Sequence, residues 1–210
     1  FGFSGIAELW YEIGKKPYPL ISFIGDTGSF LRNLPEEENR VKEAAKEVMS
    51  GSFSFLGCPE VSVKDIENID WGLDFKNNYR WPARFFRDLD LNCLNETSDI
   101  KIPWELSRMQ WLVPIAQSFL LDPKEKYAEF CMAVIWHWIN GNPYGRGPNW
   151  GVAMEAAMRI FIWTWLFKIF HMSKSWSDPI FQSVFLTSLF EHGIFCNRYM
   201  ENFGVNSNHI

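Results

Sequence analysis

The sequence predicts an all-α fold made of antiparallel helical hairpins, and two observations support this. Four apolar segments follow one another after residue 102, and residues that typically begin or end helices separate them. These segments are apolar on nearly every side, so the helices are expected to pack in layers and not as one amphipathic shell. The expected helices cover residues 103–121, 123–138, 150–171 and 178–202.

The composition is that of a globular chain. With 210 residues, of which 47% are hydrophobic and 21% charged, it can form one large domain or a part of one. The net charge of −5 gives no reason to expect nucleic acid or an anionic membrane surface as a partner. Eleven residues are Trp, and these rings either fill a helical core or line a groove for sugars. Core packing is the favoured interpretation for any single Trp.

Several classes of site and segment are not predicted. The run IFIWTWLFKIF (160–170) contains Lys168 and is much shorter than the ~20 residues of a membrane span. Cys58, Cys93, Cys131 and Cys196 form no CxxC pattern, so they are interpreted as small buried hydrophobes, and no metal site or cofactor is expected. The chain begins without Met and stops at NSNHI, which we interpret as an excerpt of a longer protein.

The chain is expected to have two parts. Residues 1–56 are predicted to be an N-terminal segment with one short helix, PEEENRVKEAAKEVM, which has acids in its first turn and is stopped by Gly51. Residues 57–210 are predicted to be the helical body. Within them, residues 57–100 carry many turn signals and aromatic rings, and are expected to form a long irregular segment packed on the helices.

Local signals predict where the four helices begin and bend. Pro114 is expected to kink the first helix. Asp122 and Asn149 are expected N-caps of the second and third helices, and the Asp178-Pro179 pair is expected to cap the fourth. The fourth helix is expected to be interrupted at Gly193.

Alternation of helix direction predicts which segments meet. Short connections make the first and second helices antiparallel, and likewise the third and fourth. If the second and third also alternate, one end of the bundle collects KIPWELSR (101–108), NPYGRGPNW (142–150) and NFGVNSNH (202–209). The other end receives LLDPKE and MSKSWSDP, which resemble plain turns. One end is therefore expected to be rich in polar and aromatic groups.

The charges of the first and third helices, apart from Lys168, fall at the same end. Glu105 and Arg108 lie three residues apart, and Glu155 and Arg159 lie four residues apart. Charges on helices that are apolar all round must be paired and buried, or must face a water-filled cavity. Two compatible interpretations follow: ion pairs that fix the helix ends, and a polar pocket in which Arg108 and Arg159 bind an anion.

Four segments together resemble the heparinase II/III family of polysaccharide lyases. They are DIKIPWELSR (99–108), the helix start DPKEKYA, the block INGNPYGRGPNWGVAMEAAMRI (139–160) and the terminal Asn-His. The resemblance runs from about Phe55 to the end of the chain. It implies that residues 57–210 are the truncated portion of an (α/α) toroid, without the C-terminal β-sandwich domain of the family.

The resemblance also implies a reaction, the β-elimination of uronic-acid polysaccharides such as glycosaminoglycans or alginate. Asn208 and His209 match a family pair in which the amide neutralises the uronate carboxylate and the His is a candidate base. The catalytic Tyr and a further His lie beyond Ile210 in the family pattern, so this chain alone is expected to be inactive. The family leans periplasmic or extracellular.

Nine residues of the matching segments are predicted to bind the anionic polysaccharide. They are Trp104, Glu105, Arg108, Asn142, Tyr144, Asn149, Trp150, Glu155 and Arg159. His137, His171 and His192 are treated as structural. Two hypotheses remain open: a lyase represented by its toroid, and a non-catalytic sugar-binding or scaffold domain of the same fold.

Overall fold

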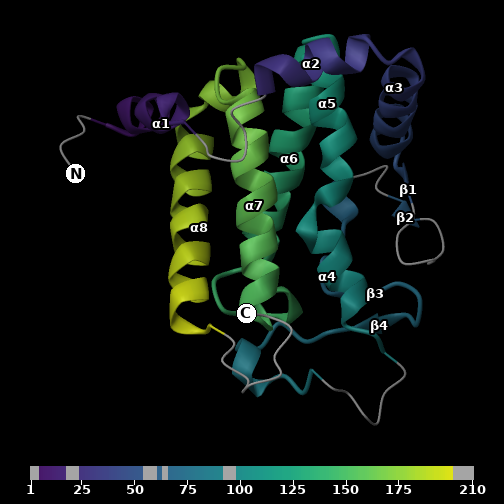
Figure 1. Ribbon diagram of the computed structural model, residues 1–210. Coiled ribbons are helices and arrows are strands. Elements are labelled where there is room, and N and C mark those ends of the chain that lie inside the picture. The colour runs from purple at the N-terminus through teal and green to yellow at the C-terminus, as the bar shows by residue number, and fades with distance from the viewer. Residues whose placement is uncertain (1–4, 18–23, 54–60, 63–65, 92–97, 201–210) are drawn as a thin grey trace, which may run out of the picture.

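The computed structural model describes residues 5–17, 24–53, 61–62, 66–91 and 98–200. The fold is all-α, as the sequence predicted (Figure 1). The α-helices of the described residues are α1 (Ile6–Lys15), α2 (Ile24–Arg32), α3 (Pro35–Met49), α4 (Lys101–Arg108), α5 (Val113–Leu121), α6 (Glu125–Gly141), α7 (Ala153–Phe170) and α8 (Pro179–Arg198).

Helices α4 to α8 form the body of the molecule and alternate in direction (Figure 1). The pair α4 and α5 rises, α6 descends, α7 rises and α8 descends in the view of Figure 1. Contacts join α5 with α6 and α7, and α8 with α6 and α7. The expected antiparallel order is therefore confirmed. The start of α4, the α6–α7 loop, the start of α7 and the end of α8 meet at one end, which we call the rim.

The N-terminal region holds more helix than expected. One short helix was predicted in residues 1–56, where the structure has α3 at the predicted residues and also α1 and α2 before it. Helix α1 packs on α8, and α2 and α3 pack on α5. Trp10, Ala45 and Val48 belong to the same hydrophobic core as the body helices, so the expected boundary at 56/57 does not separate two cores.

The segment between α3 and α4 is irregular, as predicted. Its described parts are two short antiparallel strand pairs, β1 (Ser52–Phe53) with β2 (Val61–Ser62) and β3 (Leu73–Asp74) with β4 (Tyr79–Arg80), and the 3-10 turns Ile66–Asn68 and Phe86–Asp88. Trp71, Trp81 and Phe86 are buried, so this segment is fixed to the helices by aromatic side chains.

The first predicted helix is broken, but not where the sequence indicated. Helix α4 ends at Met109, which has a left-handed backbone (φ 58°), and a 3-10 turn leads into α5. Pro114 lies in the first turn of α5 and starts that helix, so the predicted kink at Pro114 is wrong. Met109 is fully buried, and its sulfur accepts a hydrogen bond from the Trp163 indole.

The N-caps of α6 and α7 differ from those predicted, and that of α8 does not. The N-cap of α6 is Lys124 and that of α7 is Val152, so the predicted caps Asp122 and Asn149 are wrong. Asp178 caps α8 as predicted, because its carboxylate accepts hydrogen bonds from the backbone N–H groups of Ile180 and Phe181. Helix α8 runs without interruption through Gly193.

Aromatic rings build the core. Seven of the Trp side chains are buried, and the other four are half-buried. Trp163 illustrates the packing: its ring is edge-on to Trp138 at 5.4 Å and stacked on Phe185 at 5.8 Å. Such pairs add ~0.5–1.5 kcal/mol to the burial of their area. The core interpretation of the tryptophans therefore holds for most of them.

Candidate functional site

An ion pair joins α4 to α7 at the rim. Arg108 donates from Nε and Nη2 to the two carboxylate oxygens of Glu155, at 2.8 and 2.6 Å, and a further N–H bonds Glu105. The Glu155 side chain has no exposed surface, and those of Arg108 and Glu105 are 17% and 20% exposed. Hydrogen bonding to Glu155 raises the pKa of Arg108 above its usual value, against the effect of burial. The bidentate geometry fixes the two helices in register.

A second arginine lies deeper, between α7 and α8. Arg159 is fully buried; it donates from Nη2 to the Asn149 carbonyl at 2.6 Å and from Nε to His192 Nε2 at 2.9 Å. Its guanidinium also lies 4.6 Å from the centre of the Trp138 ring and 5.4 Å from that of Trp150. Burial lowers the pKa of Arg159 to about 9, although Glu155 opposes this change. Arg159 is therefore still a cation at neutral pH.

His192 is the neutral partner of Arg159. Because Nε2 accepts from the guanidinium, the ring proton is on Nδ1, which lies 2.7 Å from the Ser188 carbonyl and donates to it. Burial and the Arg159 charge hold the pKa of His192 well below 6.5. The sequence had indicated a structural His, and this contact agrees with that interpretation.

The loop between α6 and α7 is held by the side chains of its own residues. Asn149 donates from Nδ2 to the Trp71 carbonyl and to Asn142 Oδ1, both at 2.8 Å. The Trp150 indole donates to the Asn142 carbonyl at 3.1 Å, and the Trp104 indole donates to the Pro148 carbonyl at 2.8 Å. Asn149 therefore ties the irregular segment to the loop, which explains its burial and its failure to cap α7.

Asp74 anchors the other side of the rim, and sequence reasoning missed it. Its carboxylate accepts hydrogen bonds from the backbone N–H groups of Lys76, Asn77 and Asp99, the last at 2.7 Å. Burial opposes ionisation, but these bonds and those from the Asn77 and Ser98 side chains lower the pKa of Asp74. The Asp in a DFKNN turn was a detectable signal, since Asp side chains bond the backbone of such turns. Its contact with residues 98 and 99, just before α4, could not be read from sequence.

The predicted binding residues do gather at the rim, but at different depths. Buried are Asn142, Asn149, Trp150, Glu155 and Arg159; half-buried are Trp104, Glu105, Arg108 and Tyr144. A side chain without exposed surface cannot contact a polymer unless the rim rearranges. Burial thus favours the ion-pair interpretation for Glu155, whose partner is Arg108, and core packing for Trp150, while Arg159 bonds the Asn149 carbonyl and His192. Asn208 and His209 lie outside the described residues.

A polar pocket of about 520 Å³ opens beside the loop. Its walls come from the 3-10 turn at 66–68, the β3–β4 hairpin and the loop residues 141–148. The charged residues that line it are Glu67, Asp70, Arg80 and Arg146. Asp70 and Arg80 form an ion pair at 3.0 Å.

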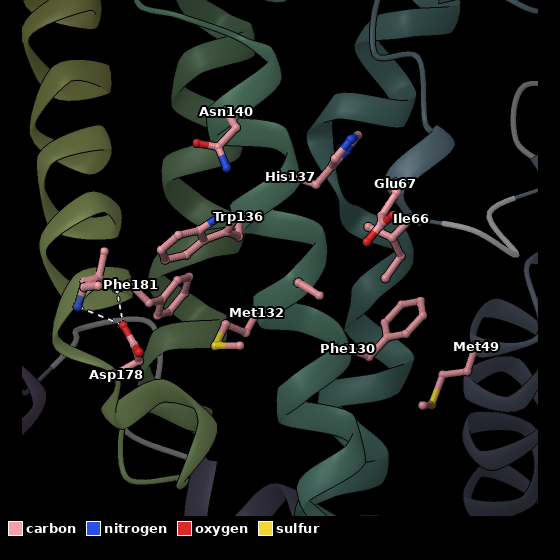
Figure 2. A pocket seen from close by; sticks show the side chains of 12 residues that line it. Met49, Ile66, Glu67, Phe130, Met132, Trp136, His137, Asn140, Asp178 and Phe181 are labelled. Atoms are coloured by element: carbon pink, nitrogen blue, oxygen red, sulfur yellow. Dashed lines mark hydrogen bonds between the residues drawn. The ribbon is translucent and has the colours of Figure 1, made fainter.

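A larger, more apolar pocket of about 1000 Å³ lies along the flank of α6 (Figure 2). Phe130, Met132 and Trp136 come from α6, Phe181 comes from the start of α8, and Met49 closes the far side. Trp136 and Phe181 are stacked with their ring centres 5.8 Å apart. His137 and Glu67 line both pockets, so the two adjoin along α6.

The described residues offer no further class of site. No group of three or more His, Cys, Asp or Glu side chains among them could hold a metal ion. Cys131 is buried and Cys196 half-buried, both as free thiols, while Cys58 and Cys93 lie outside the described residues. In the same part of the chain, no helix has the length and apolarity needed to cross a membrane.

Comparison with known proteins gives one match. Residues 33–210 match the family described as heparinase II/III N-terminus. The match begins at the end of α2 and takes in α3, about twenty residues before the point where the motif resemblance starts. No curated protein and no solved structure matches the chain.

Proposed function

This chain belongs to the heparinase II/III N-terminal family, and from that membership we propose that it is the toroid portion of a polysaccharide lyase. The substrate would be a glycan containing uronic acid, such as a glycosaminoglycan or an alginate-like polymer, cleaved by β-elimination. The observation that carries the proposal is the family match over residues 33–210, which includes every rim segment.

The arrangement of the rim supports the proposal. The last turn of α8 reaches the rim, where Phe195 packs on Trp150 with ring centres 5.1 Å apart and Cys196 Sγ lies 3.5 Å from the Ala153 carbonyl. The chain therefore leaves α8 at the rim, ten residues before Asn208. The half-buried residues Trp104, Glu105, Arg108 and Tyr144 lie at the same end.

The chemistry proposed for Asn208 and His209 meets the main difficulty of this reaction. The proton on C5 of a uronate is adjacent to a carboxylate, and its pKa is too high for a side-chain base. An amide that hydrogen-bonds the carboxylate lets it take up the developing negative charge. His209 then removes the C5 proton or orients the base, the C4–C5 double bond forms and the C4–O bond breaks. An acid protonates the leaving oxygen.

The buried rim residues have a supporting role in this proposal. Arg108 and Glu155 fix α4 against α7, and Arg159 fixes the loop by its bond to the Asn149 carbonyl. A site that must place an amide and a base around one carbon needs rigid supports, since a small displacement lowers the rate strongly. We assign Asn142, Asn149, Trp150, Glu155 and Arg159 this positioning role.

The test uses the full-length protein and the ultraviolet absorbance of the unsaturated uronate product. Asn208→Ala should lower kcat by ~10²–10³, with a much smaller change in KM, because the lost donor matters most in the transition state. The control is Asn197→Ala, an exposed Asn of α8, which should leave kcat unchanged. Equal rates for Asn208→Ala and wild type would refute the catalytic assignment. If the full-length protein forms no product from any uronic-acid polymer, the result would favour the alternative, a non-catalytic sugar-binding domain.

A further inference from the structure

The loop 142–150 exposes one charged side chain. Its sequence is NPYGRGPNW, and Arg146 is its single ionisable cation. Asn142, Pro148, Asn149 and Trp150 are buried, whereas Arg146 is exposed and lines the 520 Å³ pocket. Asn149 and Trp150 stabilise the loop by their hydrogen bonds to Asn142, and the Arg146 side chain is exposed to solvent.

The backbone that carries Arg146 is fixed on both sides. Gly145 and Gly147 have positive φ values of 68° and 82°, which side chains rarely tolerate. The Gly145 carbonyl accepts from the Phe86 N–H at 2.9 Å, and the Gly147 N–H donates to the Arg84 carbonyl at 2.8 Å. Arg146 therefore sits on a rigid bridge between two segments, and less backbone freedom is lost when its side chain binds a ligand.

The ion pair among the described residues of the pocket does not include Arg146. Arg80 is paired with Asp70, whose other carboxylate oxygen accepts from the Gly72 N–H at 3.1 Å. Arg146 has no ion pair among the described residues. The remaining acid of the pocket, Glu67, lies at the side shared with the apolar flank pocket. The loop side of the pocket thus presents an uncompensated guanidinium.

We propose that this pocket is a subsite for an acidic sugar residue, with Arg146 binding its anionic oxygens. The proposal rests on the proposed function for the substrate class. A guanidinium presents a planar fork of N–H donors that matches a carboxylate or sulfate with two hydrogen bonds. The pocket volume falls within the range of ligand sites, and the half-buried Pro82 supplies an apolar wall for the face of a sugar ring.

Calorimetric titration of the full-length protein tests the subsite with three probes. They are an alginate oligosaccharide with carboxylates only, a dextran sulfate oligosaccharide with sulfates only, and uncharged dextran. Arg146→Ala should weaken binding of the preferred anionic probe about tenfold, as expected for a lost charge-assisted pair. Arg146→Lys should recover part of the affinity, because it keeps the charge but not the fork. The preferred probe identifies the anion.

Arg40→Ala is the matched control and should bind like wild type, since Arg40 is an exposed arginine of α3, a helix that lies away from the rim (Figure 1). The affinity of wild type should fall with added salt, and that of Arg146→Ala should fall less. Unchanged affinity in Arg146→Ala, with melting as for wild type, would overturn the subsite even if the protein is an active lyase. An inactive wild type whose binding still depends on Arg146 would instead refute the lyase and keep the subsite.

Discussion

The two ends of the helical body use polar groups differently. At the rim, Glu155, Arg159 and His192 are fully buried and bond one another or segments distant in sequence. At the opposite end, Asp178 is exposed and caps its own helix, and Glu125, half-buried, accepts from Ser175 N and Oγ, both at 2.6 Å. The polar groups named at the opposite end are exposed or half-buried caps, and those at the rim form a buried charged network.

The opposite end is also covered by two helices, α1 and α2. The Trp10 indole of α1 donates to the His171 carbonyl at 3.0 Å, and Arg32 of α2 donates to the Leu120 carbonyl at 3.2 Å. These contacts attach α1 to the α7–α8 connection and α2 to the end of α5 (Figure 1). The comparison teaches that, among the described residues, the buried charged groups are concentrated at the rim and not at the end that α1 and α2 cover.

The largest effect is expected for the ion pair of the rim. Glu155→Ala leaves Arg108 without its bidentate partner in a mostly buried place, and should lower the free energy of unfolding by ~3–5 kcal/mol. The measurement is urea unfolding followed by circular dichroism. The control is Glu37→Ala, which breaks the exposed pair with Arg40 on α3 and should cost less than ~1 kcal/mol. Similar losses in the two variants would mean that the rim pair is no more important than a surface pair.

An intermediate effect is expected from the titration of His192. Its pKa is held well below 6.5 in the folded protein, so between these two values the unfolded chain binds a proton that the folded chain does not. The contribution of His192 to stability should therefore be constant above pH ~6.5 and fall below it, by up to ~1.4 kcal/mol per pH unit.

The control for this pH dependence is His192→Gln, compared with wild type at pH 7 and pH 5. His171, whose pKa burial also lowers, is present in both proteins and cancels from the difference. The stability gap between the two proteins should shrink as the pH falls. A gap that does not change with pH would show that His192 is not held neutral by the network.

The smallest effect is expected at the opposite end. Asp178→Ala removes the cap of α8 and its two hydrogen bonds at 2.8 Å, and should cost ~1 kcal/mol. Asp178→Asn, which keeps an accepting oxygen, should recover most of this loss. Thermal unfolding of both variants measures the difference. A loss as large as that of Glu155→Ala would remove the distinction between the two ends.

The sequence by itself determined the helices and their order. Apolar segments separated by cap and turn residues predicted four helices between residues 103 and 202, and short connections predicted that the first and second, and the third and fourth, are antiparallel. The same reasoning placed Glu105, Arg108, Glu155 and Arg159 at one end. These are local signals, which a sequence carries within about twenty residues.

Only the tertiary structure decided what lies far away in sequence. The break at Met109 follows from its burial against Trp163, 54 residues later, and Asn149 is occupied by Trp71, 78 residues earlier, and so does not cap α7. Helices α1 and α2 are positioned by α8 and α5. The burial of individual side chains could not be predicted either. Arg146 and Arg159 belong to the same block, 139–160, yet Arg159 is enclosed by two tryptophan rings and Arg146 faces a pocket. Burial depends on which surfaces meet after the chain has folded, and no local pattern encodes that.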